Sequence, residues 1–189
     1  MSVTLHTNFG DLKIEVFCES VPKTAEVRFQ MMDFSKETPF PLTAVLTASQ
    51  NFLALCASGY YDQSPFHRLI PNFMIQTGVL ATRPRRIQRP ARASGVLPFE
   101  DEIRPTLKHN ARGIVSMANK GPATNGSQFF ILFDKAAHLD GLNTVFGKLI
   151  GDDSLVTLSK LEALEIDKKS RPKEKAFIEK ITVHANPLA

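Results

Sequence analysis

Two short stretches of the chain combine strong hydrogen-bonding side chains with large apolar ones. Residues 66–76 read FHRLIPNFMIQ, and residues 116–131 begin with SMAN and end with NGSQFFI. In each stretch an arginine or an amide stands among bulky apolar neighbours. That composition is typical of a small concave site that grips an uncharged ligand. These two stretches are therefore the candidate functional residues of the chain.

The other residue types that commonly carry chemistry are scattered. The histidines form no pair at i,i+4 spacing and have no carboxylates arranged beside them, so we expect no metal site. Cys18 and Cys56 also lack metal-ligand spacing, and we interpret both as small buried apolar side chains. We expect no cofactor. The histidines considered are His6, His67, His109, His138 and His184.

At these two stretches the sequence resembles the cyclophilins, the cyclosporin-binding peptidyl-prolyl isomerases, whose signatures read FHRxIxxFMxQxG and SMANxGPxTNGSQFFI. The resemblance implies catalysis of rotation about X–Pro bonds. Amide resonance opposes that rotation with a barrier of roughly 18–20 kcal/mol. A donor aimed at the prolyl nitrogen draws the lone pair out of resonance. The reaction therefore needs a donor and a pocket for the proline ring, and no nucleophile or metal.

Arg68 is the best candidate donor, because a guanidinium offers several N–H groups and keeps its charge. By resemblance it matches the catalytic arginine of the family. The alternative is an ordinary surface arginine on a strand. The residues that match the family's proline pocket are large and apolar, although plain core residues look similar. They are Phe73, Met74, Phe130 and Leu139.

Two neutral amides lie within otherwise apolar segments. An unpaired buried amide is costly, so we expect Gln76 and Gln128 to face the site and to bond substrate or Arg68. By resemblance, Asn119, preceded by Ala118, matches the position whose backbone pairs with the extended substrate.

Three further residues lie in or beside the motifs. His67 points away from Arg68 if the segment is extended, so we interpret it as structural. His138 stands where many cyclophilins have a tryptophan, and Asn143 where many have a histidine. We assign His138 to the substrate site. Loss of the indole predicts weaker cyclosporin binding, while catalysis can persist.

The apolar pattern predicts a mainly β protein. Alternation in residues 3–7 and 12–16 predicts a hairpin, and further short apolar runs are bounded by Gly, Pro and Asn. Helices are expected over residues 51–58 and after residues 152–154, where leucines recur every third position through Leu164. The resemblance implies a closed eight-stranded antiparallel barrel capped by two helices. The remaining runs are 66–70, 73–76, 113–117, 129–133, 144–149 and 178–184.

One segment, residues 27–50, interrupts the family's first helix. It has no clear period, and its 24 residues correspond to 72 nucleotides that can begin and end with intron boundary bases. We hypothesise a retained intron, which transcripts that keep these nucleotides would contradict. If the segment is translated, Thr47 to Gln50 form a capping box that restarts the helix before Asn51.

A second segment, residues 79–98, replaces the family's glycine-rich loop. It holds five arginines, and without them the formal charge of +4 becomes 4 − 5 = −1. With ordinary codon choices, reading the codons one base earlier can give the family's loop motifs at both ends. We therefore favour a local frame error over a solvent loop or an arm for nucleic acid or acidic partners. No aromatic residue is interleaved, so we expect no direct nucleic-acid binding.

The remaining expectations concern the whole chain. Its 189 residues suit one domain, and no apolar run is long enough to span a bilayer, so we expect a soluble, intracellular monomer. Residues 1–7, 51–58 and 184–187 resemble the type 3 subgroup of cyclophilin-like proteins, whose association with the spliceosome implies nuclear as well as cytoplasmic location and spliceosomal partners. Two functions remain open: an active isomerase acting on proline-containing proteins, and a catalytically weak proline-binding scaffold.

Overall fold

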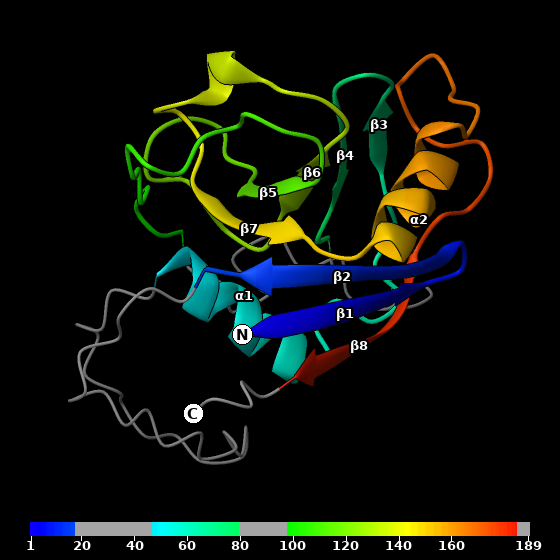
Figure 1. Cartoon of the computed structure of the whole chain (residues 1–189), viewed down its shortest axis with the longest axis horizontal. Coiled ribbons are helices and arrows are strands. Elements are labelled where there is room, and N and C mark those ends of the chain that lie inside the picture. The colour runs from blue at the N-terminus through cyan, green and yellow to red at the C-terminus, as the bar shows by residue number, and fades with distance from the viewer. Residues whose placement is uncertain (18–46, 80–97, 185–189) are drawn as a thin grey trace, which may run out of the picture.

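The computed structural model describes residues 1–17, 47–79 and 98–184 of the chain. These residues form eight strands, two α-helices and one short 3-10 helix, η2 (Figure 1). The elements in chain order are β1 Ser2–Thr7, β2 Gly10–Val16, α1 Ala48–Ala57, β3 Arg68–Ile70, β4 Met74–Thr77, β5 Ile114–Met117, β6 Phe129–Leu132, η2 Ala137–Leu139, β7 Val145–Leu149, α2 Asp152–Glu162 and β8 Ile178–His184.

All eight strands belong to one antiparallel sheet, in the order β3-β4-β6-β5-β7-β2-β1-β8. The sheet curls until its two edge strands approach each other. Just before β3 and β8, Pro65 and Phe177 form an isolated bridge, and the Phe66 N–H donates to the Ala176 carbonyl at 2.9 Å. These bonds satisfy backbone groups that an open edge would leave exposed. The predicted eight-stranded barrel with two helices is confirmed.

The barrel interior holds the main apolar core. Alternate residues of each strand face inward, as the two-residue period of a strand requires. Phe129 is fully buried at the centre, with its ring 5.2 Å from that of Phe52 and 5.4 Å from that of Tyr61. A second apolar cluster forms from residues of the opposite parity, among them Met74 and Phe130. The sheet is therefore apolar on both faces where β4, β6 and β5 meet.

Helix α1 begins within residues 27–50, the segment for which we hypothesised a retained intron. The Thr47 hydroxyl accepts a hydrogen bond from the Gln50 N–H, and the Thr47 N–H donates to the Gln50 side-chain oxygen. This reciprocal pair confirms the predicted capping box. Ser49 is buried and donates to the Phe17 carbonyl at 3.0 Å. The last residues of the 27–50 segment are thus integral to the fold. The predictions for residues 27–46 and 80–97 lie outside the described residues.

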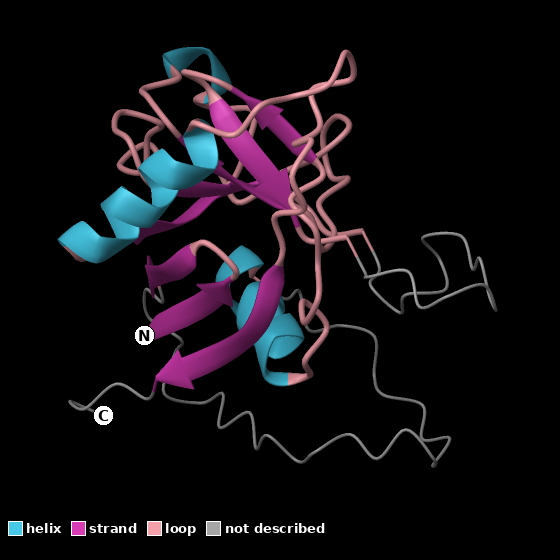
Figure 2. Cartoon of the chain, turned by 90° about the vertical axis from the view of Figure 1, so that its right-hand side faces the viewer, coloured by secondary structure: helices cyan, strands magenta, loops and turns pink. Residues whose placement is uncertain are grey.

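Helix α2 buries only part of the predicted leucine face. Leu158 and Leu161 are fully buried, but Leu155 is 38% exposed and Leu164 lies beyond the end of the helix. The reason is geometric: a three-residue step falls 60° short of a full turn, so four such leucines spread over half the helix circumference. Thr157 is buried instead. Figure 2 shows α2 apart from α1, and both contribute side chains to the interior core.

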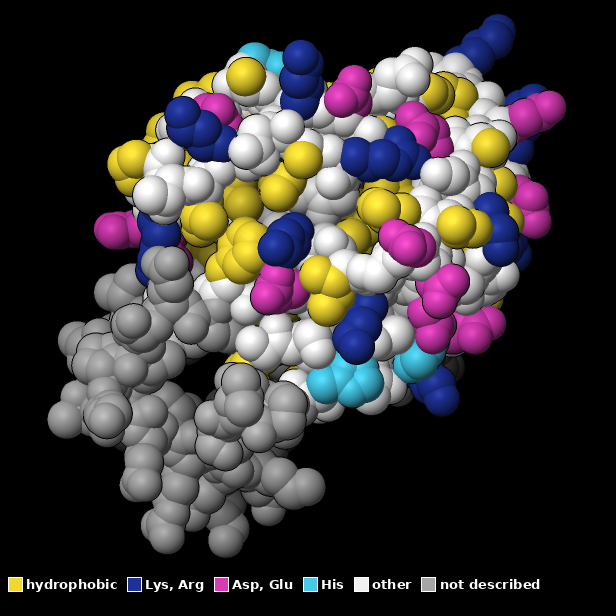
Figure 3. All heavy atoms as spheres, in the orientation of Figure 1, with side chains coloured by type: hydrophobic (Ala, Val, Ile, Leu, Met, Phe, Trp, Pro, Cys, Tyr) yellow, Lys and Arg dark blue, Asp and Glu magenta, His cyan; other side chains and the backbone are white. Residues whose placement is uncertain are grey.

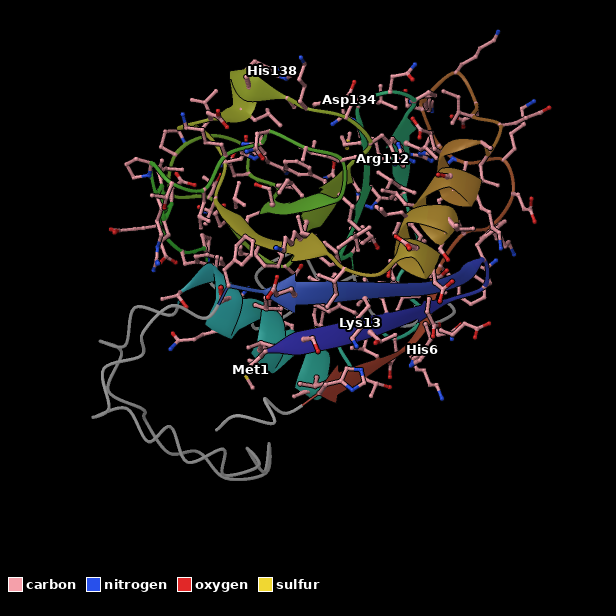
Figure 4. The ribbon with its side chains drawn as sticks, in the orientation of Figure 1. Met1, His6, Lys13, Arg112, Asp134 and His138 are labelled. Carbon is pink, nitrogen blue, oxygen red and sulfur yellow. The ribbon has the colours of Figure 1, made fainter. Side chains whose placement is uncertain are left out.

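The outer face of β1 and β8 is polar. The His6 ring contacts the Asp11 carboxylate at 2.8 Å and the Thr182 hydroxyl at 2.9 Å. Nearby, the Thr4 hydroxyl lies 2.9 Å from the His184 ring. Figure 3 shows histidine side chains together on this part of the surface, and Figure 4 labels His6 there.

Cys56 is buried on α1, and burial raises the pKa of its thiol far above the ordinary value, which matches the interpretation as an apolar side chain. Cys18 lies outside the described residues. Among the described helices, none is long and apolar enough to cross a membrane.

Candidate active site

A row of directly opposed residues crosses four strands of the barrel. Arg68 on β3 faces Gln76 on β4, Gln76 faces Phe130 on β6, and Phe130 faces Ser116 on β5. Directly opposed residues of an antiparallel sheet point to the same side. Arg68, Gln76 and Phe130 therefore share the outer face of the barrel. Arg68 is exposed and Phe130 is nearly buried, so the row runs from an exposed cation to an apolar wall.

The predicted pocket residues come together on this outer face. Met74 is 3% exposed and Phe130 6% exposed, and both belong to one cluster that is separate from the barrel interior. Phe73, Ala118 and Leu139 pack against that cluster with part of their surface exposed. Phe73 and Met74 reach the same cluster although they are consecutive, because Phe73 lies in the turn before β4. These residues are not part of the interior core.

The two predicted amides bond to each other. The Gln76 Nε2 donates to the Gln128 Oε1 at 2.8 Å, and both side chains are half-buried. Our prediction was that they bond substrate or Arg68. The mutual bond satisfies one half of each amide, which lowers the cost of placing both beside an apolar pocket.

A buried histidine that the sequence did not reveal supports Phe130 from behind. His109 is 1% exposed, and its ring is stacked against that of Phe130 with centroids 6.2 Å apart. Its Nε2 lies 3.0 Å from the Ser116 hydroxyl and its Nδ1 lies 2.9 Å from Asp140. Three fixed contacts hold the imidazole ring, and the ring in turn fixes the position of Phe130.

Burial is the main cause that lowers the pKa of His109, and the hydrogen bond and charge of Asp140 oppose it. The His109 N–H also donates to Asp140 at 2.8 Å, and this bond is the main reason why the pKa of the Asp140 carboxyl is lowered. In the neutral state, His109 can donate from Nδ1 to Asp140, while the Ser116 hydroxyl donates to the Thr144 carbonyl at 2.9 Å.

Asp101 organises the loop that contains Asn119, a role that we did not predict from the sequence. Its carboxylate accepts hydrogen bonds from the side chains of Asn119 at 3.1 Å and Asn125 at 2.7 Å, and from the Ala123 N–H at 2.8 Å. The Asn119 side chain also donates to the Leu142 carbonyl at 2.9 Å. The Asn119 side chain is thus used within the protein, which fixes the backbone that the resemblance assigns to substrate pairing.

His138 lies in η2, with its ring 5.4 Å from that of Phe73 and tilted by 35° (Figure 4). It is exposed and lies beside Phe73 at the edge of the outer apolar cluster. Asn143 donates to the Met117 carbonyl at 3.0 Å. His67 is half-buried with its N–H bonded to the Gln76 carbonyl, and burial is the main cause that lowers its pKa, in keeping with a structural role.

Comparisons with known proteins agree with this geometry. A family model described as cyclophilin type peptidyl-prolyl cis-trans isomerase/CLD matches residues 34–183. A peptidyl-prolyl cis-trans isomerase-like 3 protein of Neurospora crassa is 64% identical over 191 residues, spanning 100% of this chain and 99% of the relative. The protein of the same name from Homo sapiens is 50% identical, spanning 100% and 99%.

A solved structure gives the same assignment. The crystal structure of a Cryptosporidium parvum cyclophilin type peptidyl-prolyl cis-trans isomerase, in the presence of the dipeptide Ala-Pro, has a TM-score of 0.70 and 37% identity. The match covers 98% of this chain and 100% of that chain. The names of the relatives confirm the resemblance to the type 3 subgroup. The chain belongs to the cyclophilin-type peptidyl-prolyl cis-trans isomerases.

Proposed function

We propose that this isomerase uses Arg68 as the donor to the prolyl nitrogen and seats the proline ring among Phe73, Met74, Phe130 and Leu139. The observation that carries the proposal is the exposed guanidinium in one cross-strand row with the apolar wall. A charge-assisted bond to the prolyl nitrogen weakens amide resonance as the bond twists, so it strengthens in the transition state. In this way the protein assists slow folding steps that depend on X–Pro rotation.

The test is a protease-coupled assay on a short X–Pro peptide. Arg68→Ala should lower kcat/KM by about 100-fold, the scale typical of removing one transition-state donor. Arg68→Lys should recover little, because an ammonium lacks the planar fork of N–H groups. Arg68 is exposed, so both variants should unfold at the same denaturant concentration as the wild type. Equal kcat/KM in wild type and Arg68→Ala would exclude this role.

The second candidate function is a proline-binding scaffold with weak turnover. The mutual bond between Gln76 and Gln128 favours it, because it occupies amide groups beside Arg68 that we expected to face substrate. Peptide binding without an Arg68-dependent rate would support the scaffold. The exposed His138 in place of an indole supports the proposal of reduced cyclosporin affinity, which a tryptophan at this position should restore.

We also propose spliceosomal partners and a nuclear pool of the protein, acting as a monomer. The support is the likeness to the type 3 subgroup. Affinity purification of the tagged protein from nuclear extract tests the partners: recovery of splicing factors supports the proposal, and their absence under conditions that recover other nuclear isomerases contradicts it.

A further inference from the structure

A hollow of about 780 Å³ borders Arg68. One wall comes from residues 63–68, which lead into β3, and the other from residues 169–177, which lead into β8. Figure 1 shows the segment that follows α2 running beside β3. We call this hollow the β3–β8 groove. Arg68 is a lining residue of the groove and also the end of the cross-strand row in the active site.

Backbone hydrogen bonds fix both walls of the β3–β8 groove. The Phe66 N–H donates to the Ala176 carbonyl at 2.9 Å, and the Leu69 N–H donates to the Ser170 carbonyl at 2.7 Å. The turn at the rim is closed by Asp167, whose carboxylate accepts the N–H groups of the residues two and four positions on, at 2.7 and 2.9 Å. A groove held in this way keeps its shape without a ligand, so binding requires little ordering.

The charge of the groove is strongly positive. Its lining includes Glu174 and four cationic side chains, and within the described residues Lys169, Arg171 and Lys175 form no salt bridge. Like charges around a concave surface focus the electrostatic potential. The cationic residues of the lining are Arg68, Lys169, Arg171 and Lys175.

The positive charge of the groove also affects the pKa of His67, another lining residue. Burial is the main cause that lowers its pKa, a hydrogen bond to the Pro65 backbone opposes this, and the charges of Arg68 and Arg171 lower it further. Asp167 behind the rim offsets part of the positive charge: N–H bonds, chiefly that of Arg171, and the charges of Arg171 and Lys169 lower its pKa.

We propose that the β3–β8 groove binds an acidic segment of the substrate polypeptide that flanks the isomerised proline. The proposal rests on the proposed role of Arg68. An extended chain advances about 3.3 Å per residue, so a polypeptide with its proline beside Arg68 enters the groove within a few residues. Carboxylates match the groove because Arg171 can bind one with two parallel bonds and lysines add point charges. The groove thus gives the isomerase a preference for Asp- and Glu-flanked prolines.

The test compares peptides with the same X–Pro centre and either three glutamates or three glutamines as flank, on the amino or the carboxyl side. We expect kcat/KM about tenfold higher for one acidic peptide at low salt, with the ratio falling as salt screens the groove. Lys169→Glu combined with Lys175→Glu should bring the ratio near one. The matched control, Lys13→Glu with Lys160→Glu, reverses the same charge outside the groove and should keep the ratio.

Equal kcat/KM for acidic and neutral peptides, or a preference that survives in the groove variant, would overturn the proposal. Binding measured by fluorescence anisotropy separates this failure from failure of the proposed function. If the protein is inactive but binds the acidic peptide with a lower Kd, and the groove variant loses this difference, the groove proposal stands and only the proposed catalysis fails. A poly-dT oligonucleotide that binds tighter than the acidic peptide, and loses binding in the groove variant, would replace the peptide by a nucleic acid and refute the assignment.

Discussion

Phe129 and Phe130 are consecutive residues of β6, and their side chains enter two different clusters. Phe129 points into the barrel, where it is fully buried among the rings of Phe52, Tyr61 and Phe146. Phe130 points outward into the cluster beside Arg68. Closing the barrel requires only the inner of these two positions to be apolar. Closing the barrel places no such requirement on the outer position, so the apolar side chain there indicates a second packing role outside the barrel.

The outer face of the barrel is not apolar on every strand. On β1 and β8 the outward side chains are polar and bond to one another, as His6 does with Asp11 and Thr182. The same architecture therefore carries a solvated outer face at one edge of the sheet and an apolar, largely buried one where β4 and β6 pair. In our proposal, the substrate binds on the outer face that departs from the solvated pattern.

The sharpest test of the two faces is a pair of truncations on β6. Phe129→Ala should lower the free energy of unfolding by about 3–5 kcal/mol, because it leaves a cavity in the closed interior. Phe130→Ala should cost less stability and lower kcat/KM by about 100-fold through loss of the pocket wall. Urea unfolding and the peptide assay measure the two effects. Phe129→Leu, which keeps most of the volume, serves if the alanine variant does not fold.

The comparison would fail if both truncations reduced kcat/KM in proportion to their loss of stability. That result would place Phe130 in the structural core rather than in a site.

A smaller effect is expected at Glu162, at the end of α2. Its carboxylate accepts from the Asn72 N–H at 3.0 Å and from Arg112 at 2.7 Å, and Arg112 donates to the Phe133 carbonyl at 2.8 Å (Figure 4). The Phe133 N–H in turn donates to the Phe73 carbonyl at 2.9 Å. Glu162 thus positions the turn that carries one wall of the pocket.

Glu162→Ala should raise KM by about three- to tenfold with a smaller change in kcat, since it loosens a wall without removing the donor. The matched control is Glu165→Ala, which removes an exposed carboxylate paired with Lys173 and should leave KM unchanged. A loss of stability in Glu162→Ala with unchanged KM would assign Glu162 a purely structural role.

Residues such as Glu162 mark the limit of prediction from the sequence. The alternation of apolar residues predicted the strands, and the motifs placed Arg68 beside Phe130, because both signals are local. The bonds from Glu162 to Asn72 and from His109 to Asp140 join residues 90 and 31 positions apart. No local pattern encodes such a pairing, so His109 looked like one of several scattered histidines.

Leu155 and Gln76 show two further reasons why the structure could not be predicted fully from the sequence. Leu155 fitted the apolar pattern, but three-residue spacing does not follow one face of a helix, so the residue remains 38% exposed. The Gln76 amide bonds to Gln128, a pairing that we did not predict, because the sequence does not show that the two side chains lie close enough to bond.

The stability of the protein should depend on pH through His109, which packs against Phe130. The folded-state pKa of His109 is lowered, so from about pH 6.5 downward the unfolded chain binds a proton that the folded chain resists. Stability should therefore fall as the pH drops from 7.5 to 5.5, which urea midpoints measure. His67 shifts in the same direction. His109→Asn should reduce the drop and His67→Asn should reduce it by its own share; an unchanged drop in both variants would contradict this origin.

The smallest effect is expected on the polar outer face of β1 and β8. His6→Ala removes two hydrogen bonds at a partly exposed position, and such surface changes usually alter stability by no more than about 0.5 kcal/mol. Because the pocket is built from β3 to β6 and the turns beside them, kcat/KM should stay at the wild-type value. A loss of activity on His6→Ala, measured with the same peptides, would show that the solvated face takes part in catalysis. That result would contradict the proposal that only the apolar outer face takes part in catalysis.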